Sequence, residues 1–148
     1  MDLKQKLADD LKIAMKSGDL NQKTTIRTLR SEIRKAEIDG GHELTNEEVL
    51  DVISKQAKQR RDSIEQYQKA GRMDLLEQEQ QELMVIESYL PQQLSDDEIT
   101  AKAKVVIINL QAKDMKAMGL VMKHLTSDLK GVADGKRISN IVRKLLTQ

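Results

Sequence analysis

The sequence predicts an all-α protein built from two helical parts. Apolar residues recur at intervals of three and four along most of the chain. Helix-starting residues and glycines separate these runs, and the alternating patterns of strands are nearly absent. With 148 residues the chain is long enough to bury a core. We therefore expect a helical hairpin assembly over residues 1–90, followed by a small three-helix domain over residues 95–148.

Each of the first two predicted helices carries an apolar stripe and ends at glycine. The first ends at Gly18, and the second follows Asp19, a residue type that favours helix N-caps. The second ends at the glycine pair 40–41, because glycine readily adopts the left-handed conformation that closes many helices. The stripe residues are Leu3, Leu7, Leu11 and Ala14 in the first helix, and Ile26, Leu29, Ile33 and Ala36 in the second.

The third and fourth helices are expected to fold back on each other. Thr45 and Glu48 match a capping box, in which each side chain bonds the backbone N–H of the other residue. The third helix closes at Gly71. The fourth stops before Pro91, because the residue that precedes a proline disfavours the helical conformation. The segment 91–94 is the expected boundary between the two parts.

Three further helices are expected after this boundary. Ser95 and Glu98 match a second capping box and begin the fifth helix. Asp114 is the expected cap of a sixth helix that ends at Gly131, and Asp134 is the expected cap of the seventh. The apolar stripes of these helices include Ile99, Ala103, Val106 and Leu110, then Met115, Met118, Met122, Leu125 and Leu129, then Ile138, Ile141, Val142 and Leu145.

Charged side chains interrupt the predicted interface between the third and fourth helices. At 100° per residue, Arg60 falls within the buried sector of the third helix, and Glu79 and Glu82 fall within the apolar stripe of the fourth. We expect these three residues to form a buried or half-buried ion pair that fixes the helix register and contributes little net stability, the alternative being a functional cleft. Arg30 and Glu37 border the apolar face of the second helix, so the network is expected to extend to them. Other cations lie outside the buried sector and are expected to be available to a partner: Lys55, Lys58 and Arg61.

The composition excludes several kinds of site. The chain has no cysteine and two histidines, His42 and His124, so we expect neither a metal site nor a thiolate nucleophile. It has no P-loop and no GxSxG motif, and we expect no cofactor. No apolar run approaches the roughly 18 residues of a membrane span, and the start MDLKQKLADDLK is unlike an export or transit peptide. We therefore predict a cytoplasmic protein without catalytic residues of its own.

Basic charge is concentrated in the C-terminal part. Residues 1–94 carry 15 basic and 18 acidic side chains, whereas residues 95–148 carry ten basic and six acidic ones. Three lysines recur every seven residues along one side of the predicted sixth helix, and Gly119 on that side indicates a close approach by a neighbouring helix or a ligand backbone. A solvated polar face explains such a row as well as an anion-binding surface does. The cations are Lys116, Lys123 and Lys130, with Lys136 and Arg137 at the start of the seventh helix.

Six segments, in order over nearly the whole chain, carry a family resemblance. They are MKSGD (15–19), TLRSEIRKAEID (28–39), KQAKQRRDSIEQYQKAGRMDL (55–75), ESYLPQQLSDDEI (87–99), MGLVMKHL (118–125) and KGVADGKRISNIVRKLL (130–146). Together they resemble the YqeY family, the stand-alone relatives of GatB. The last two also resemble the tail domain of GatB, a subunit of the glutamine-dependent aminoacyl-tRNA amidotransferase. In that enzyme the tail contacts tRNA, while the kinase and amidase chemistry lies in domains that have no counterpart here.

The resemblance implies a non-catalytic accessory protein that binds tRNA or associates with a tRNA amidotransferase. Family members are described by similarity as carbon–nitrogen ligases with glutamine as amido donor, but the shared segments imply a common tail more than a common reaction. The alternative is a protein–protein interaction module that docks an acidic partner and has no role with RNA. An amide-forming enzyme would need an ATP site and an ammonia-releasing nucleophile, for which the sequence offers no candidate. The implied tRNA-facing residues are Gly119, Lys123, Lys130, Gly131, Lys136 and Arg137.

Overall fold

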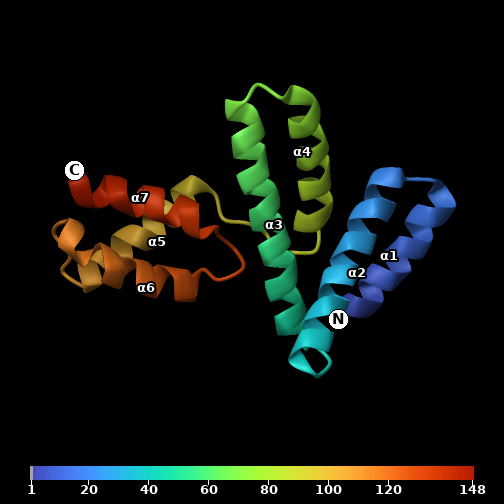
Figure 1. The fold of residues 1–148 in the computed structure, drawn as a ribbon. Coiled ribbons are helices and arrows are strands. Elements are labelled where there is room, and N and C mark those ends of the chain that lie inside the picture. Colours follow the sequence, from blue (N-terminus) through green and yellow to red (C-terminus); the bar gives the residue numbers. More distant parts are fainter. Residues whose placement is uncertain (1) are drawn as a thin grey trace. The chain divides into compact units, whose positions relative to one another are not determined.

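The structure is a computed structural model that describes residues 2–148. Within this range every regular element is a helix, which confirms the predicted all-α class (Figure 1). The chain divides into two compact units, Met1–Pro91 and Gln92–Gln148. The elements in chain order are α1 (Leu3–Ser17), α2 (Leu20–Gly40), α3 (Asn46–Lys69), α4 (Met73–Glu87), α5 (Asp96–Asn109), the 3-10 helix η1 (Met115–Ala117), α6 (Met118–Asp128) and α7 (Gly135–Thr147).

Local capping interactions define most of the helix ends. Thr45 accepts a hydrogen bond from the N–H of Glu48, and the Glu48 carboxylate accepts one from the N–H of Thr45. Ser95 and Glu98 form the same reciprocal pair at the start of α5. The C-terminus of α1 closes at Gly18, whose φ of 75° lies in the left-handed region where a side chain is unfavourable. Each of these ends is encoded within a few residues of sequence.

One apolar core holds α1 to α4 together in the first unit. Helix α2 contacts α1, α3 and α4, and α3 lies antiparallel beside α4 (Figure 1). Tyr89, just after α4, donates its hydroxyl to a carboxylate oxygen of Asp10 in α1 at 2.6 Å. Burial, reinforced by Asp10, raises the pKa of the Tyr89 hydroxyl well above its usual range, so Tyr89 is a neutral donor at pH 7. The largest fully buried side chains here are Leu7, Ile26, Leu29, Val49, Ile53 and Ile86.

The second unit has a core of its own among α5, α6 and α7. The three helices contact one another pairwise. The segment before α5 is fastened to the turn between α6 and α7, because the N–H of Leu94 donates to the carbonyl of Val132 at 2.8 Å. The Gln93 amide also donates to the carbonyl of Gly131 at 2.9 Å. The buried core residues are Ile99, Ala103, Val121, Leu125, Leu129, Ile138, Val142 and Leu146.

The sixth helix is shorter than the sequence pattern predicts. The Asp114 carboxylate accepts from the N–H of Lys116 and starts η1, so the α-helix begins only after this 3-10 turn. Helix α6 ends before Leu129, whose carbonyl accepts two backbone bonds that turn the chain. Lys116 therefore lies in η1, Lys123 in α6 and Lys130 in the turn that follows. The three lysines do not share one helix, contrary to the prediction.

Candidate nucleic-acid interface

Arg60 of α3 lies between two carboxylates of α4. Its Nε is 2.8 Å from Glu82 Oε2 and 3.5 Å from Glu79 Oε2, and the three side chains are between 17% and 21% exposed. These contacts are ion pairs without hydrogen-bond alignment, because Arg60 Nε and Glu79 Oε2 are buried and lack a hydrogen-bond partner among residues 2–148. Burial raises the pKa of Glu79, with Arg60 opposing and Glu82 adding to the effect. The cluster is a half-buried contact between α3 and α4.

The three cations expected to face outward from α3 differ in their surroundings. Lys58 Nζ is 3.1 Å from Asp62, one turn further along the same helix. Arg61 reaches Glu87 of α4 at 3.2 Å and is only 23% exposed. Lys55 is exposed. Two of the three cations therefore meet acids of the same chain, which weakens the case for an open surface that docks an acidic partner.

Within residues 2–148, the network of Arg60, Glu79 and Glu82 does not extend to Arg30 and Glu37 as expected. Glu37 accepts instead from the Lys4 ammonium of α1 at 2.8 Å and from the N–H of Leu44 at 2.9 Å. Both bonds lower the pKa of the Glu37 carboxyl, that of Lys4 most. This contact could not be predicted from the sequence, since Lys4 and Glu37 lie 33 residues apart on different helices.

Lys116 and Lys123 are the two exposed lysines on η1 and α6. Among residues 2–148, neither side chain is paired with an acid or hydrogen-bonded. Lys130 and Lys136 are exposed as well. These four lysines thus lie on the surface of the second unit rather than in its core.

Three of the six acids of the second unit are engaged by backbone N–H groups at helix starts. Glu98 bonds the N–H of Ser95, and Asp114 and Asp134 accept backbone N–H groups at the starts of η1 and α7. A carboxylate is favoured there by the partial positive charge of the helix N-terminus. These acids lower the net charge of the unit, but they make no ion pair with Lys116 or Lys123.

Arg137 connects the first turn of α7 to the segment that enters α5. Its guanidinium donates to the carbonyl of Leu94 at 2.9 Å and to Asp96 Oδ1 at 2.7 Å. The sequence resemblance implies that Arg137 faces tRNA. The structure instead gives the side chain a positioning contact within the unit, and Lys136 beside it is the exposed cation of this turn.

The two glycines of the predicted interface differ in what surrounds them. A Cβ at Gly119 would meet no atom within 4 Å, so a neighbouring helix does not approach this position. Of the two explanations for a glycine here, the one based on helix packing is therefore wrong. Gly131 has a φ of 82° in the turn after α6, a conformation that side chains rarely adopt. The left-handed backbone conformation at position 131 therefore favours glycine.

His42 and His124 lie in different surroundings. His42 Nε2 lies 3.1 Å from Glu48, and this contact, helped by the Gly40 carbonyl, raises the pKa of the imidazole. His124 is exposed on α6. Across residues 2–148, no three His, Asp or Glu side chains are gathered closely enough to hold a metal ion.

Comparisons with known proteins give the family of the chain. The model of the YqeY-like proteins matches residues 4–146. "Altered inheritance of mitochondria protein 41, mitochondrial" of Lachancea thermotolerans is 43% identical over 71% of this chain, which spans 58% of that relative's length. The protein of the same name from Clavispora lusitaniae is 37% identical, with 81% of this chain and 72% of the relative covered. That from Pyrenophora tritici-repentis is 31% identical over 95% of this chain and 79% of the relative.

These names contradict the cytoplasmic location predicted from the sequence, since the relatives are named as mitochondrial proteins. The prediction rested on the absence of a leader-like N-terminal pattern, which is a weak guide to location. In the part of the chain that the structure describes, no helix combines the length and the apolar character needed to cross a bilayer. On the match over residues 4–146 and the identities above, the chain belongs to the family of YqeY-like proteins.

Proposed function

We propose that the second unit, Gln92–Gln148, binds the sugar–phosphate backbone of folded RNA, and that its RNA is tRNA. The observation that carries this proposal is the pair of exposed lysines, Lys116 and Lys123, which have no acidic partner among the described residues. The unit carries ten basic and six acidic side chains, and three of those acids are engaged at helix starts. A net positive surface of this kind favours a polyanionic partner.

Recognition through the backbone suits the residues that are present. The second unit has no Phe, Tyr or Trp, so it lacks the large aromatic rings on which exposed bases usually stack. Lysines contact phosphates as mobile point charges, and folded RNA is recognised largely through its shape and its phosphate and sugar groups. The choice of tRNA rests on the resemblance of segments 118–125 and 130–146 to the GatB tail.

We also propose that the protein associates with a glutamine-dependent tRNA amidotransferase. This association is supported by the same segments, and it would make the protein an accessory factor that brings tRNA to an enzyme. The carbon–nitrogen ligase activity ascribed to the family by similarity would then reside in that enzyme. The rival function, an acidic protein docked on Lys55, Lys58 and Arg61, has less support, because two of these cations are already paired.

Fluorescence anisotropy with labelled tRNA tests the proposal on the full chain. Lys116→Glu combined with Lys123→Glu should weaken binding by at least about tenfold at 0.1 M salt, because two phosphate contacts are lost and two repulsive charges are added. The slope of log K against log salt should become shallower by about 1.5, as expected for two contacts.

A matched control changes the same amount of charge in the other unit. Lys55→Glu with Lys58→Glu should leave tRNA affinity within about threefold of the unaltered protein, since long-range charge effects are screened at 0.1 M salt. Equal weakening by both double variants would show attraction to net charge alone and would overturn the proposed site. Binding lost only in the α3 variant would place the RNA on the first unit and would overturn the proposed site as well.

A further inference from the structure

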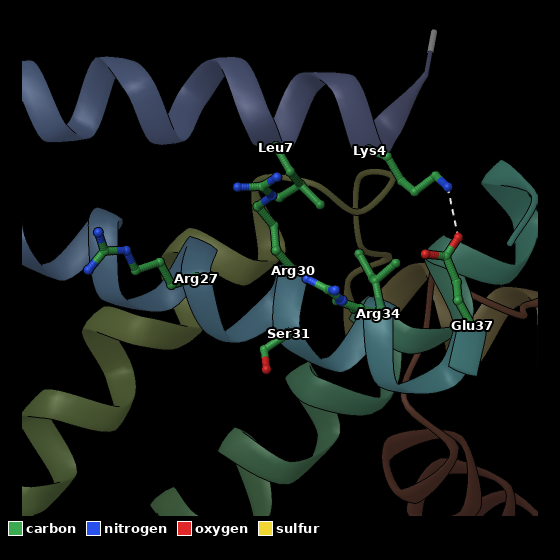
Figure 2. A pocket seen from close by; sticks show the side chains of 8 residues that line it. Lys4, Leu7, Arg27, Arg30, Ser31, Arg34 and Glu37 are labelled. Carbon is green, nitrogen blue, oxygen red and sulfur yellow. Dashed lines mark hydrogen bonds and ion pairs between the residues drawn. The ribbon is translucent and has the colours of Figure 1, made fainter. Parts of the chain in front are cut away.

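A pocket of about 510 Å³ lies along α1 and α2 in the first unit. Three arginines of α2 line it at positions i, i+3 and i+7: Arg27, Arg30 and Arg34. Figure 2 shows Arg30 extending from α2 toward α1 near Leu7, and Lys4 of α1 meeting Glu37 beside the pocket. A sequence search for cations at helical spacing would have found this row, but not the pocket that α1 completes.

The charge of this pocket is not balanced by the chain. Among residues 2–148, none of the three arginine side chains forms an ion pair or a hydrogen bond. The one lining acid, Glu37, is already bonded by the Lys4 ammonium and the N–H of Leu44. The charges of Lys4 and Glu37 cancel, so three guanidinium groups remain uncompensated around one concave site.

The arginine positions are unfavourable without a ligand. Side chains three and four residues apart are neighbours on a helix, and like charges at these spacings oppose its formation. Arg27 and Arg34 are separated by about 10 Å along the axis at 1.5 Å per residue. This row of arginines is longer than one phosphate group. All three arginines belong to α2, so the helix holds them on one face.

We propose that the pocket along α1 and α2 binds a small ligand that carries at least two phosphate groups. Arginine donates paired, parallel hydrogen bonds to phosphate oxygens, so neighbouring arginines can hold one phosphate between them. A monophosphate dianion would leave part of the triple positive charge uncompensated, whereas a diphosphate reaches all three guanidinium groups. Ser31 also lines the pocket, with its hydroxyl pointing away from α1 in Figure 2.

A small ligand fits this site better than an RNA strand does. The site is a concavity of the size typical of small-molecule sites, which is about 300–1,000 Å³. Its lining comes from only two helices, α1 and α2, and it includes the apolar residues Leu7 and Ile33. The inference does not depend on RNA binding by the second unit, because none of the residues involved belongs to that unit.

Isothermal titration of the full chain with inorganic pyrophosphate, ADP and orthophosphate at constant ionic strength tests this proposal. Pyrophosphate should bind saturably at one site, and orthophosphate at least about tenfold more weakly. Arg30→Gln with Arg34→Gln should weaken pyrophosphate binding by at least about tenfold. A matched control removes two cations of α2 that do not line the pocket: Lys23→Gln with Lys35→Gln should change binding by less than about threefold.

Each outcome supports or overturns the site. Saturable binding of both pyrophosphate and ADP supports a diphosphate ligand. Tighter binding of ADP would then indicate a nucleotide, and tighter binding of pyrophosphate would indicate the inorganic ion. Absence of saturable binding overturns the proposal, and so does equal weakening by both double variants.

The backbone amide chemical shifts of the unaltered protein provide a test that needs no variant, since pyrophosphate must move the resonances of α1 and α2. Displacement of bound pyrophosphate by tRNA at stoichiometric concentration would assign the pocket to RNA instead. Lys116→Glu with Lys123→Glu must leave pyrophosphate binding intact, which separates this site from the RNA proposal.

Discussion

Arg60 illustrates how a charged residue takes part in a helix interface. The helical angle places it toward α4, and the structure brings it within 2.8 Å of Glu82 and 3.5 Å of Glu79. The angular position of a residue on a helix is fixed by the sequence, so its direction could be predicted. The charged end of a long side chain can lie several ångströms away from that direction. Arg61 therefore reaches Glu87 although its backbone position lies outside the buried sector.

The two glutamates beside Arg60 should respond differently to neutralisation. Glu82→Gln removes the closer carboxylate and leaves Arg60 partly buried with only the 3.5 Å contact, so we expect the free energy of unfolding to fall by about 1–2 kcal/mol. Glu79→Gln should raise the free energy of unfolding at pH 7, because burial disfavours the charged form of Glu79. Urea unfolding followed by circular dichroism measures both changes.

The pH dependence of the Glu79 effect follows from linkage. A carboxyl with a raised pKa binds its proton more tightly in the folded state, so its ionised form destabilises the fold above that pKa. This destabilisation is relieved as the pH falls through the raised pKa. The advantage of Glu79→Gln should therefore be present at pH 7 and vanish below about pH 4. An advantage that grows on acidification would contradict the assignment.

At the scale of single elements, most helix ends are determined by residues close in sequence. The capping boxes at Thr45 and Ser95 begin helices where they are predicted, because a capping box involves only four consecutive residues. The start of α6 was missed, since an aspartate can cap a 3-10 turn as readily as an α-helix. The apolar spacing alone does not distinguish the two at this point.

A substitution at Gly119 distinguishes an effect on helix stability from an effect on RNA binding. Its surroundings leave room for a methyl group, so Gly119→Ala should raise the free energy of unfolding by about 0.5–1 kcal/mol through helix propensity. If an RNA backbone approaches this position, the same methyl group must weaken tRNA affinity. Thermal unfolding and anisotropy on one preparation give both values. A stabilised protein with unchanged affinity would remove Gly119 from the interface.

At the scale of the whole molecule, the two units differ in charge and in the sites they offer. The first unit carries 15 basic and 18 acidic side chains, and within it the arginine pocket is a local exception. The second carries ten basic and six acidic ones, with its lysines exposed. Charge balance could be counted from the sequence. The internal use of Arg137 and the pocket along α1 and α2 could not, because both depend on contacts between segments distant in the chain.

The RNA site can be located without altering any residue. Full-length protein bound to tRNA that carries photoreactive 4-thiouridine is crosslinked, digested, and analysed by mass spectrometry. We expect the crosslinked peptides to come from η1, α6 and the start of α7, close to Lys116, Lys123 and Lys136. Crosslinks confined to residues 2–91, or none at a protein concentration that saturates the anisotropy signal, would contradict RNA binding by the second unit.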